Sequence, residues 1–391
     1  DNSGGQLGVG DTLDRGDQTN EMGANLVPAW LGTGRSVQQV WSGGFHDCAL
    51  LDDGTVKCWG YNTAGQLGVG HRGDRGTARF AIGDVIERVA LGTGRSAVTL
   101  ALGRFHTCAI LDDGSVKCWG DGYWGQLGYG NTSARGDNAG EMGDALPVVP
   151  LGAGRTAVAI AAGARDTCAI LDDGSVKCWG DNSYGQLGQG DQVDRGDDPG
   201  ELGDALPPIA LGAGRTAIAI GVAETRACAL LDDGRVKCWG DNGLGVLGIG
   251  DTFDRGRIPG QMGDALPAVA LGAGRTAVGL AVGESHACAL LDDGHVKCWG
   301  YNGLGELGLG DTTNRGADNA AMGDALPAVA LGAGRTVVAV TSAGRHTCAL
   351  LDDATIKCWG YNSSGQLGLE HSETRGTSAG GMGDNLPALR F

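Results

Sequence analysis

A pair of cysteines recurs every 60 residues along the chain, and this period constrains the fold more than any other feature. No insertion or deletion interrupts it between the first pair and the last. A long repeat of this kind is typical of arrays or closed propellers, in which neighbouring units bury what one unit cannot bury alone. The cysteines of the six pairs are Cys48 and Cys58, Cys108 and Cys118, Cys168 and Cys178, Cys228 and Cys238, Cys288 and Cys298, and Cys348 and Cys358.

The glycine content indicates what kind of unit is repeated. Glycine makes up 75 of the 391 residues, more than twice the ordinary usage of roughly 7%. Only 10 residues are proline, which excludes collagen, and glycine inside a helix costs about 1 kcal/mol relative to alanine. The hydrophobic fraction of 41% argues against disorder. We therefore expect a turn-dense, all-β chain.

Each repeat is expected to contain four strands. In one copy, residues 98–102 form a short β-prone run, and residues 108–111 and 115–119 flank the turn Asp112-Asp113-Gly114. The fourth strand, at residues 146–151, contains two prolines, which places it at a sheet edge. Four strands in 60 residues suit one blade of a β-propeller.

The hairpin between the second and third strands explains the cysteines. Its turn, Asp52-Asp53-Gly54, predicts a three-residue loop with glycine in the left-handed region. Counting outward places Cys48 opposite Cys58 as a non-hydrogen-bonded pair, with Cα atoms about 4.5 Å apart, which a disulfide can span. We favour six disulfides in an oxidising compartment over free or zinc-bound thiols. Ala354 replaces the turn glycine in the last copy, which predicts strain there.

Three motifs of the repeat match a known family. They are G-x-x-H-T-C-A-L at residues 103–110, G-x-V-x-C-W-G at 114–120 and G-Q-L-G-x-G at 125–130. The unit resembles the repeat of the regulator-of-chromosome-condensation family, and the resemblance covers essentially the whole chain. It implies a ring of blades, commonly seven, that is often closed by joining strands from both ends of the chain. Members of the family act on a small GTPase or chromatin, inhibit β-lactamases or sense ultraviolet light.

The number of blades stays open between six and seven. We interpret residues 1–391 as a single propeller domain that begins with a half repeat, 1–31, and continues with the repeats 32–91, 92–151, 152–211, 212–271, 272–331 and 332–391. Seven full units would need 420 residues, 29 more than the chain has. Either six blades close with a spare outer strand or one of seven blades is incomplete. We favour seven, and expect the chain to be part of a longer protein.

Charge and hydropathy exclude several classes of partner. The chain has 29 basic and 46 acidic residues, a formal charge of −17, which disfavours nucleic-acid binding. No apolar run approaches the ~20 residues that span a bilayer, so we expect no membrane insertion. The lysines all occupy one position of the repeat, so no polybasic segment exists: Lys57, Lys117, Lys177, Lys237, Lys297 and Lys357.

Other recurring polar residues are expected to be structural. A histidine before each cysteine hairpin is predicted to bond the backbone of its own repeat, and the tryptophan of Cys-Trp-Gly is predicted to pack inside the blade. An arginine–aspartate clasp, such as Arg75 with Asp84, is favoured over a calcium site in the acidic loops. With no nucleophile–base pair, we expect no enzyme activity and no cofactor. The histidines are His46, His106, His286 and His346, replaced by Asp166 and Arg226 in the middle copies.

The positions at which the copies differ provide the best functional indication. Large apolar side chains follow Cys-Trp-Gly in successive repeats, and they predict either a partner surface or packing against the next repeat. They are Tyr123, Trp124, Tyr184, Leu244 and Leu304. Two sequons, at Asn131 and Asn362, are candidate glycosylation sites if the protein is secreted from a eukaryotic cell.

These observations predict a non-enzymatic, extracellular or cell-surface propeller that acts as a structural or protein-interaction module. Near-identical repeats make self-assembly into a larger structure a subordinate hypothesis. A secreted inhibitor or receptor that binds one protein through the apolar side chains is the main alternative. A regulator of a small GTPase is a weaker one.

Overall fold

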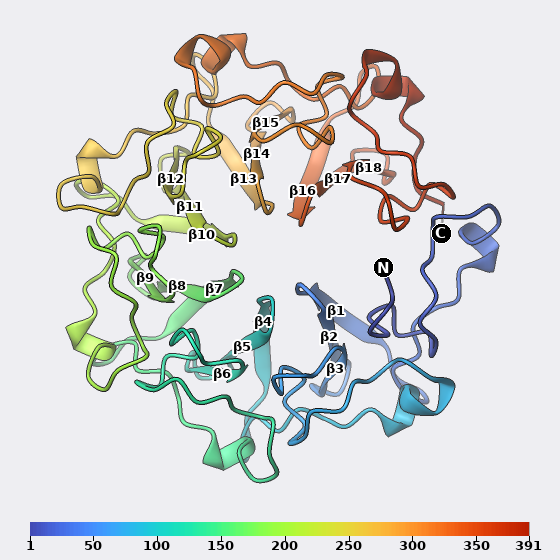
Figure 1. The fold of residues 1–391 in the computed structure, drawn as a ribbon, viewed down its shortest axis with the longest axis vertical. Helices are drawn as coiled ribbons and strands as arrows, with labels where there is room; N and C mark the ends of the chain where they lie inside the picture. The colour runs from blue at the N-terminus through green and yellow to red at the C-terminus, as the bar shows by residue number, and fades with distance from the viewer. Residues whose placement is uncertain (391) are drawn as a thin grey trace. The chain divides into compact units, whose positions relative to one another are not determined.

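The computed structural model describes residues 1–390, and these residues form six three-stranded antiparallel sheets, one in each cysteine-containing repeat (Figure 1). Each sheet is a meander in which the middle strand pairs with both neighbours. The strands are β1 (Val37–Ser42), β2 (His46–Leu51), β3 (Val56–Gly60), β4 (Ala97–Leu102), β5 (His106–Leu111), β6 (Val116–Gly120), β7 (Ala157–Ala162), β8 (Asp166–Leu171), β9 (Val176–Gly180), β10 (Ala217–Val222), β11 (Arg226–Leu231), β12 (Val236–Gly240), β13 (Ala277–Val282), β14 (His286–Leu291), β15 (Val296–Gly300), β16 (Val337–Ala343), β17 (His346–Leu351) and β18 (Ile356–Gly360).

The described residues pack as two compact units, each with three sheets. Unit 1 comprises residues 1–13, 27–183 and 192–209, and unit 2 comprises residues 14–26, 184–191 and those from 210 onward. The sheets of unit 1 contain β1–β9, and those of unit 2 contain β10–β18. The boundaries fall inside repeats, because a loop of one repeat packs on the hairpin of the next.

The hairpin between the second and third strands forms in the predicted register. Cys48 pairs with Cys58, and Leu50 pairs with Val56. All six disulfides form, with Cα–Cα distances of 4.0–4.1 Å. Gly54 takes φ 78°, and Ala354 is held at φ 65° in the equivalent turn of the last hairpin. The expectation of a left-handed residue after the two aspartates is therefore confirmed, and alanine adopts that conformation at a cost in backbone energy.

The first strand of each sheet contains a bulge that the sequence did not predict. In β4 the register shifts between Ala97 and Thr99, so Val98 has no partner on β5. Val98 is 57% exposed, although its neighbours Ala97 and Leu100 are buried. The bulge recurs at the same place in all six sheets. An apolar residue in a β-prone run is thus directed to solvent, because an extra residue in one strand is left out of the ladder.

The expected fourth strand is absent as a strand, and that prediction is wrong. Residues 146–151 run beside β6 but make a single backbone hydrogen bond to it, from Val149 N–H to the carbonyl oxygen of Val116. Pro147 and Pro150 have no N–H to donate, which removes two possible bonds. The equivalent segment of the preceding repeat, residues 86–91, contains no proline and also forms no strand, although Val89 N–H donates to the carbonyl oxygen of Val56. The prolines alone therefore do not account for the missing strand.

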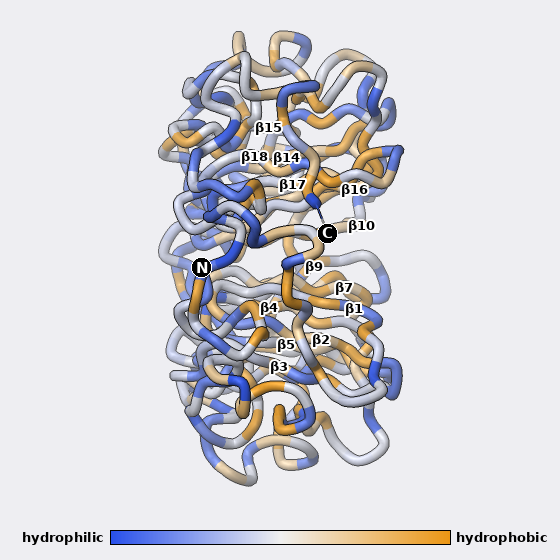
Figure 2. The backbone as a smooth tube through the Cα atoms, turned by 90° about the vertical axis from the view of Figure 1, so that its right-hand side faces the viewer, coloured by the Kyte–Doolittle hydropathy of each residue, from blue (hydrophilic) through white to orange (hydrophobic). Residues whose placement is uncertain are grey.

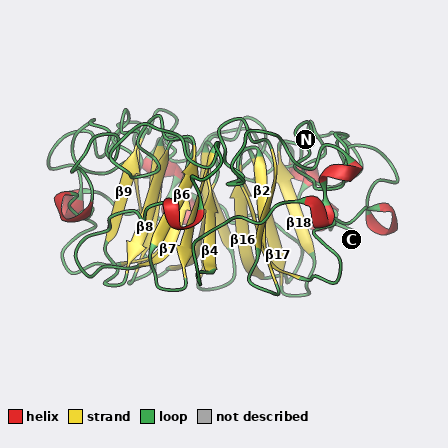
Figure 3. Cartoon of the chain, turned by 90° about the horizontal axis from the view of Figure 1, so that it is seen from below, coloured by secondary structure: helices red, strands yellow, loops and turns green. Residues whose placement is uncertain are grey.

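A 3-10 turn precedes this segment in every repeat, and the repeated lysine fixes it in place. Lys117 Nζ donates to the carbonyl oxygens of Leu91, 2.9 Å away, and Gly143, 2.7 Å away. Figure 3 shows these short turns in red within the loops. They are η1 (Gly23–Asn25), η2 (Arg79–Ala81), η3 (Gly83–Val85), η4 (Gly143–Ala145), η5 (Gly203–Ala205), η6 (Gly263–Ala265), η7 (Asn319–Ala321), η8 (Gly323–Ala325), η9 (Ala379–Gly381) and η10 (Gly383–Asn385).

Hydrophobic cores lie between consecutive sheets of each unit. In unit 1, Cys108 and Val116 of one hairpin pack with Leu171 and Trp179 of the next repeat. The tryptophans of Cys-Trp-Gly are buried as predicted. Trp179 Nε1 donates to the carbonyl oxygen of Gln126, in the Gly-Gln-Leu-Gly loop of the preceding repeat (2.9 Å). Figure 2 shows hydrophobic positions along the strands and hydrophilic ones in many loops. Each hairpin therefore packs against the loop of the preceding repeat.

The half repeat at residues 1–31 behaves in both units as the loop part of a further repeat. In unit 1, a Cβ on Gly76 would clash with the carbonyl oxygen of Gly5, and in unit 2 a Cβ on Gly16 would clash with that of Gly365. Consecutive repeats contact each other in the same way at Gly136 and Gly65. Residues 1–390 thus form six blades, together with the loops, but not the strands, of a seventh repeat.

Candidate protein-interaction surface

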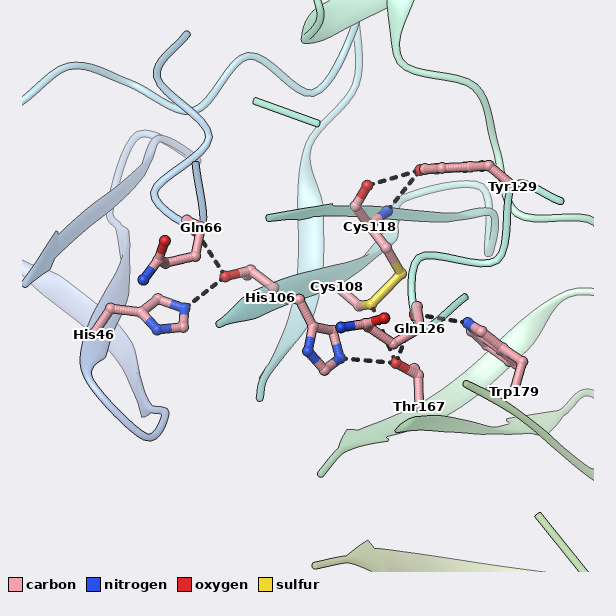
Figure 4. Close-up of a disulfide and its surroundings, with 10 residues drawn as sticks. His46, Gln66, His106, Cys108, Cys118, Gln126, Tyr129, Thr167 and Trp179 are labelled. Carbon is pink, nitrogen blue, oxygen red and sulfur yellow. Dashed lines mark hydrogen bonds between the residues drawn. A yellow bond between two sulfur atoms is a disulfide. The ribbon is translucent and has the colours of Figure 1, made fainter. Parts of the chain in front are cut away.

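The recurring histidines link consecutive repeats. In unit 1, His46 Nε2 lies 2.7 Å from Thr107 Oγ1, and that hydroxyl donates to the carbonyl oxygen of Gln66 (Figure 4). His106 is related to Thr167 in the same way, at 2.9 Å. Because the hydroxyl proton is used on Gln66, the imidazole must donate from Nε2. The prediction that each histidine bonds its own repeat's backbone is therefore wrong, since the ring reaches the neighbouring strand instead.

These histidines are held neutral and are structural. Burial lowers the pKa of His46 to about 3, with a smaller contribution from His106, and lowers that of His106 to about 4. In unit 2, Arg226 takes the histidine position and donates to the carbonyl oxygens of Gly283 and Glu284, each 2.7 Å away. Burial lowers its pKa to about 10. In unit 1, Asp166 is fully buried at the same position, and burial, then the nearby Asp181, raises its pKa.

The expected arginine–aspartate clasp does not form, and that prediction is wrong. Arg75 makes a paired interaction with Glu87, at 2.9 and 2.6 Å. Asp84 instead accepts hydrogen bonds from the backbone N–H and the hydroxyl of Thr33, at 2.9 and 2.6 Å. Asp84 lies within η3, and in this turn it faces Thr33 rather than Arg75.

No alternative site of charged ligands is evident in the described part of the chain. Among residues 1–390, no group of three or more histidine, cysteine, aspartate or glutamate side chains is arranged to bind a metal ion. Within the same residues, no helix has the length and apolar character needed to cross a bilayer.

One end of the three sheets of unit 1 presents a continuous group of loops. Gly44 N–H donates to the carbonyl oxygen of Gly103 (3.0 Å), and Arg104 N–H donates to that of Gly163 (3.3 Å). These bonds join the loops between the first and second strands of successive repeats. Asp121 N–H donates to the carbonyl oxygen of Phe105 (2.8 Å), which attaches the loop after β6 to the same group. Side chains from three repeats are thereby brought to one surface.

Aromatic rings and arginines alternate on this surface. Phe45 stacks on Phe105 with ring centroids 5.2 Å apart, and Tyr61 meets Phe45 edge-on at 5.6 Å. The guanidinium carbon of Arg104 lies 5.5 Å from the Phe45 ring and 5.8 Å from the Phe105 ring. These distances are within cation–π range, so the exposed Arg104 side chain lies beside both stacked rings and contacts each of them.

A second arginine extends the pattern into the next repeat. The Arg165 guanidinium carbon lies 5.1 Å from the Trp124 ring, and Tyr123 meets Trp124 edge-on at 5.2 Å. Tyr123 is 66% exposed. We name the whole group the aromatic–arginine surface; it consists of Phe45, Tyr61, Arg104, Phe105, Tyr123, Trp124 and Arg165.

The structure divides the five apolar side chains singled out in the sequence between the two units. Tyr123 and Trp124 belong to the aromatic–arginine surface of unit 1. Tyr184 and Leu244 are 42% and 47% exposed in unit 2, and Leu304 is half-buried there. Their role as a partner surface stays a prediction.

Sequence reasoning missed the other half of the aromatic–arginine surface. Phe45 and Phe105 precede the buried histidine in the first two repeats, where later copies have Arg165, Thr225 and Ser285. An aromatic residue beside a structural histidine in two adjacent repeats was the available signal. The contact with Arg104 could not be read from the sequence, because it depends on the hydrogen bonds between neighbouring loops.

The two sequons differ in access. Asn362 is fully buried, and its side-chain amide donates to the carbonyl oxygens of His371 and Glu373. Attachment of a glycan to that nitrogen would break both bonds, so the folded chain does not offer Asn362, and this candidate is corrected. Asn131 is partly exposed, with Thr132 and Ser133 exposed beside it.

Comparison with known proteins identifies the family. The model of the RCC1-like domain matches residues 1–379. The chain belongs to the RCC1-like domain family. Disulfide-linked hairpins are thus a feature of this particular RCC1-like domain, and the resemblance in the motifs around the cysteines is confirmed.

Curated relatives share the domain in different contexts. The chain is 30% identical over 342 residues to the ultraviolet-B receptor UVR8 of Arabidopsis thaliana, an alignment that covers 86% of the chain and 67% of the receptor. It is 34% identical over 277 residues to the E3 ubiquitin-protein ligase HERC2 of Homo sapiens, covering 70% of the chain but 5% of the ligase. The RCC1-like domain is therefore one small part of the second relative.

Solved structures agree on the propeller fold. Human WBSCR16 superposes with a TM-score of 0.70 at 19% identity, over 95% of this chain and 89% of that one. Prp20p from Saccharomyces cerevisiae, whose structure was reported with its binding properties to Gsp1p and histones, superposes with a TM-score of 0.67 at 18% identity, over 97% and 85%. At these identities the likeness concerns the fold alone, and it confirms the all-β propeller class.

Proposed function

We propose that this RCC1-like domain is a non-enzymatic, extracellular or cell-surface module that binds another protein through the aromatic–arginine surface. The observation that carries the proposal is the cluster of Arg104 with the stacked rings of Phe45 and Phe105 on joined loops. Aromatic residues and arginine dominate the energetic centres of protein interfaces. Side chains that are already ordered by one another also lose less conformational freedom when a partner binds.

The disulfides support the extracellular part of the proposal. All twelve cysteines are paired, and eleven of the twelve side chains lie in the buried core. Six hairpin disulfides persist in an oxidising environment and are rare in the reducing cytosol. The same observation weighs against a cytosolic or nuclear regulator of a small GTPase, although a relative in Caenorhabditis elegans is named an X-linked retinitis pigmentosa GTPase regulator homolog.

Alanine variants of the exposed rings test the proposal. A partner recovered with the wild-type protein should be lost with Trp124→Ala or Phe105→Ala, while the thermal midpoint stays close to that of the wild type. Phe80→Ala is the matched control, because Phe80 is an 85% exposed ring in unit 1 outside the surface. A partner retained by both surface variants would refute the proposal.

Two further measurements address the remaining parts. Tyr184→Ala tests whether the partner surface extends to the apolar residues of unit 2, as the sequence predicts. Mass spectrometry of the protein from its natural source under non-reducing conditions should find all six disulfides formed. Free thiols in the natural protein would contradict the extracellular assignment and favour the GTPase-regulator alternative.

A further inference from the structure

The hydroxyl group of Tyr129 makes two hydrogen bonds to the backbone of one disulfide-linked cysteine. Cys118 N–H donates to Tyr129 Oη at 2.9 Å, and the same hydroxyl donates to the carbonyl oxygen of Cys118, also at 2.9 Å (Figure 4). Both residues lie in unit 1. A single side-chain group thus serves as the partner of both the donor and the acceptor of Cys118.

These two backbone groups lie on the edge of β6 that faces away from β5. Leu111 N–H donates to the carbonyl oxygen of Ser115, and hydrogen-bonded pairs alternate along an antiparallel ladder, so Cys118 and its partner Cys108 form a non-hydrogen-bonded pair. The N–H and carbonyl groups of Cys118 therefore point away from β5. Because Cys118 is fully buried, bulk water does not reach them, and a buried backbone group without a partner costs free energy.

The repeats of unit 2 have the same backbone groups but an aliphatic side chain in place of the tyrosine. Their third-strand cysteines pair in the register of Cys118 and are buried. Within the described part of unit 2, no residue is hydrogen-bonded to the outward N–H or carbonyl oxygen of these cysteines. The cysteines are Cys238, Cys298 and Cys358, and the residues at the tyrosine position are Ile249, Leu309 and Leu369.

The segment that runs beside the third strand does not supply the partners in unit 2. Val329 N–H donates to the carbonyl oxygen of Val296 at 2.8 Å, which is two residues before Cys298. In the first repeat the corresponding segment follows the strand further, and Lys57 forms a β-bridge with Arg88. No such bridge forms at the equivalent place in the described residues of unit 2. The outward groups of Cys298 therefore need a partner other than this segment.

We propose that each hairpin of unit 2 binds an ordered water molecule between the outward N–H and carbonyl oxygen of its third-strand cysteine, at the place that Tyr129 Oη takes in unit 1. A leucine or isoleucine side chain ends short of the point that a tyrosine hydroxyl reaches, which leaves room beside the two polar groups. The water accepts from the N–H and donates to the carbonyl oxygen, as the hydroxyl does. A buried site with two or more polar partners suits a water molecule. This site lies in the interior and is independent of the proposed function.

A crystal structure of the whole domain that shows ordered waters tests the proposal directly. A water oxygen should lie about 2.7–3.2 Å from both the nitrogen and the oxygen of the Cys298 backbone, whereas at Cys118 the Tyr129 hydroxyl should hold that place. The Tyr129→Leu variant should acquire a new water at Cys118. A protein atom bonded to both Cys298 groups, or no water at Cys118 in Tyr129→Leu, would overturn the proposal.

Urea unfolding of two variants tests the same site in solution. Leu309→Tyr and Leu309→Phe introduce rings of similar size, but only tyrosine brings a hydroxyl that can replace the water. The unfolding equilibrium constant should be about tenfold larger for Leu309→Phe, because the ring displaces the water and leaves the Cys298 groups unpaired. Leu244→Tyr and Leu244→Phe are the control pair and should be equally stable, since Leu244 is 47% exposed. Equal stability of the two Leu309 variants would contradict the proposal, and if neither folds, the Tyr129→Leu structure decides.

Discussion

Acidification should destabilise the protein through its buried histidines, and His106 offers the clearest test. Its imidazole is fully buried, and burial lowers its pKa from 6.5 to about 4. The unfolded chain therefore binds a proton on this side chain between pH 6.5 and 4, whereas the folded chain does not. Stability is fully present above pH 6.5 and decreases as the pH falls through this window.

The magnitude follows from the width of that window. Each pH unit over which the unfolded state holds one more proton than the folded state changes the free energy of unfolding by about 1.4 kcal/mol. Between pH 7 and pH 4.5, His106 should thus remove about 2 kcal/mol. Asp47 acts in the opposite direction, because burial raises its pKa to about 7 and the folded state binds its proton more tightly.

The assay compares variants, so that the contributions of other groups cancel. Urea unfolding followed by tryptophan fluorescence gives the free energy of unfolding at pH 7 and at pH 4.5. His106→Gln lowers stability at both pH values by losing the bond to Thr167, but its decrease between them should be smaller than that of the wild type by about 2 kcal/mol. His295→Gln, at a largely exposed histidine, is the control and should retain the wild-type decrease. An equal decrease in the wild type and His106→Gln would refute the reasoning.

Three further predictions concern the turn, the disulfides and the sequons. Ala354→Gly should raise the free energy of unfolding by about 1 kcal/mol, since glycine adopts φ 65° without the steric cost that alanine bears; an unchanged urea midpoint would contradict this. Replacing both Cys108 and Cys118 by serine should lower the free energy of unfolding by about 2–3 kcal/mol, because the unfolded chain loses a short cross-link. A loss smaller than about 0.5 kcal/mol would show that the cross-link does not restrict the unfolded chain. In a glycosylating secretory host, a glycan should be lost on Asn131→Gln and not on Asn362→Gln, as measured by intact mass, and modification at Asn362 would contradict its burial.

Local features of the fold could be predicted from the sequence because short-range geometry determines them. The turn at Asp52-Asp53-Gly54 fixes the hairpin register, and the register places Cys48 beside Cys58. The prediction of a fourth strand was wrong, because a β-prone composition does not show whether a segment forms a ladder. Residues 146–151 make one bond to β6 through Val149, and the proline-free residues 86–91 also form no strand.

Features that join repeats were harder to predict, since periodicity does not say which repeat a side chain reaches. His46 and Thr107 are both repeated residues, yet only the structure shows that they contact each other across the repeat boundary. The role of the repeated lysine was missed for the same reason, as its partners are carbonyl oxygens that carry no sequence signal. Half of the aromatic–arginine surface was visible as Tyr123 and Trp124, and the half built on Arg104 required the loop arrangement.

The bond from Trp179 to the loop before it has a consequence for engineering the chain. The segment that must be kept intact runs from one Gly-Gln-Leu-Gly loop through the hairpin of the following repeat, because Trp179 Nε1 donates to the carbonyl oxygen of Gln126. A segment cut at the boundaries of the sequence repeat would separate these two partners. A duplicated or deleted module should therefore begin just before Gly125, rather than at residue 152, if its new junctions are to match the natural ones.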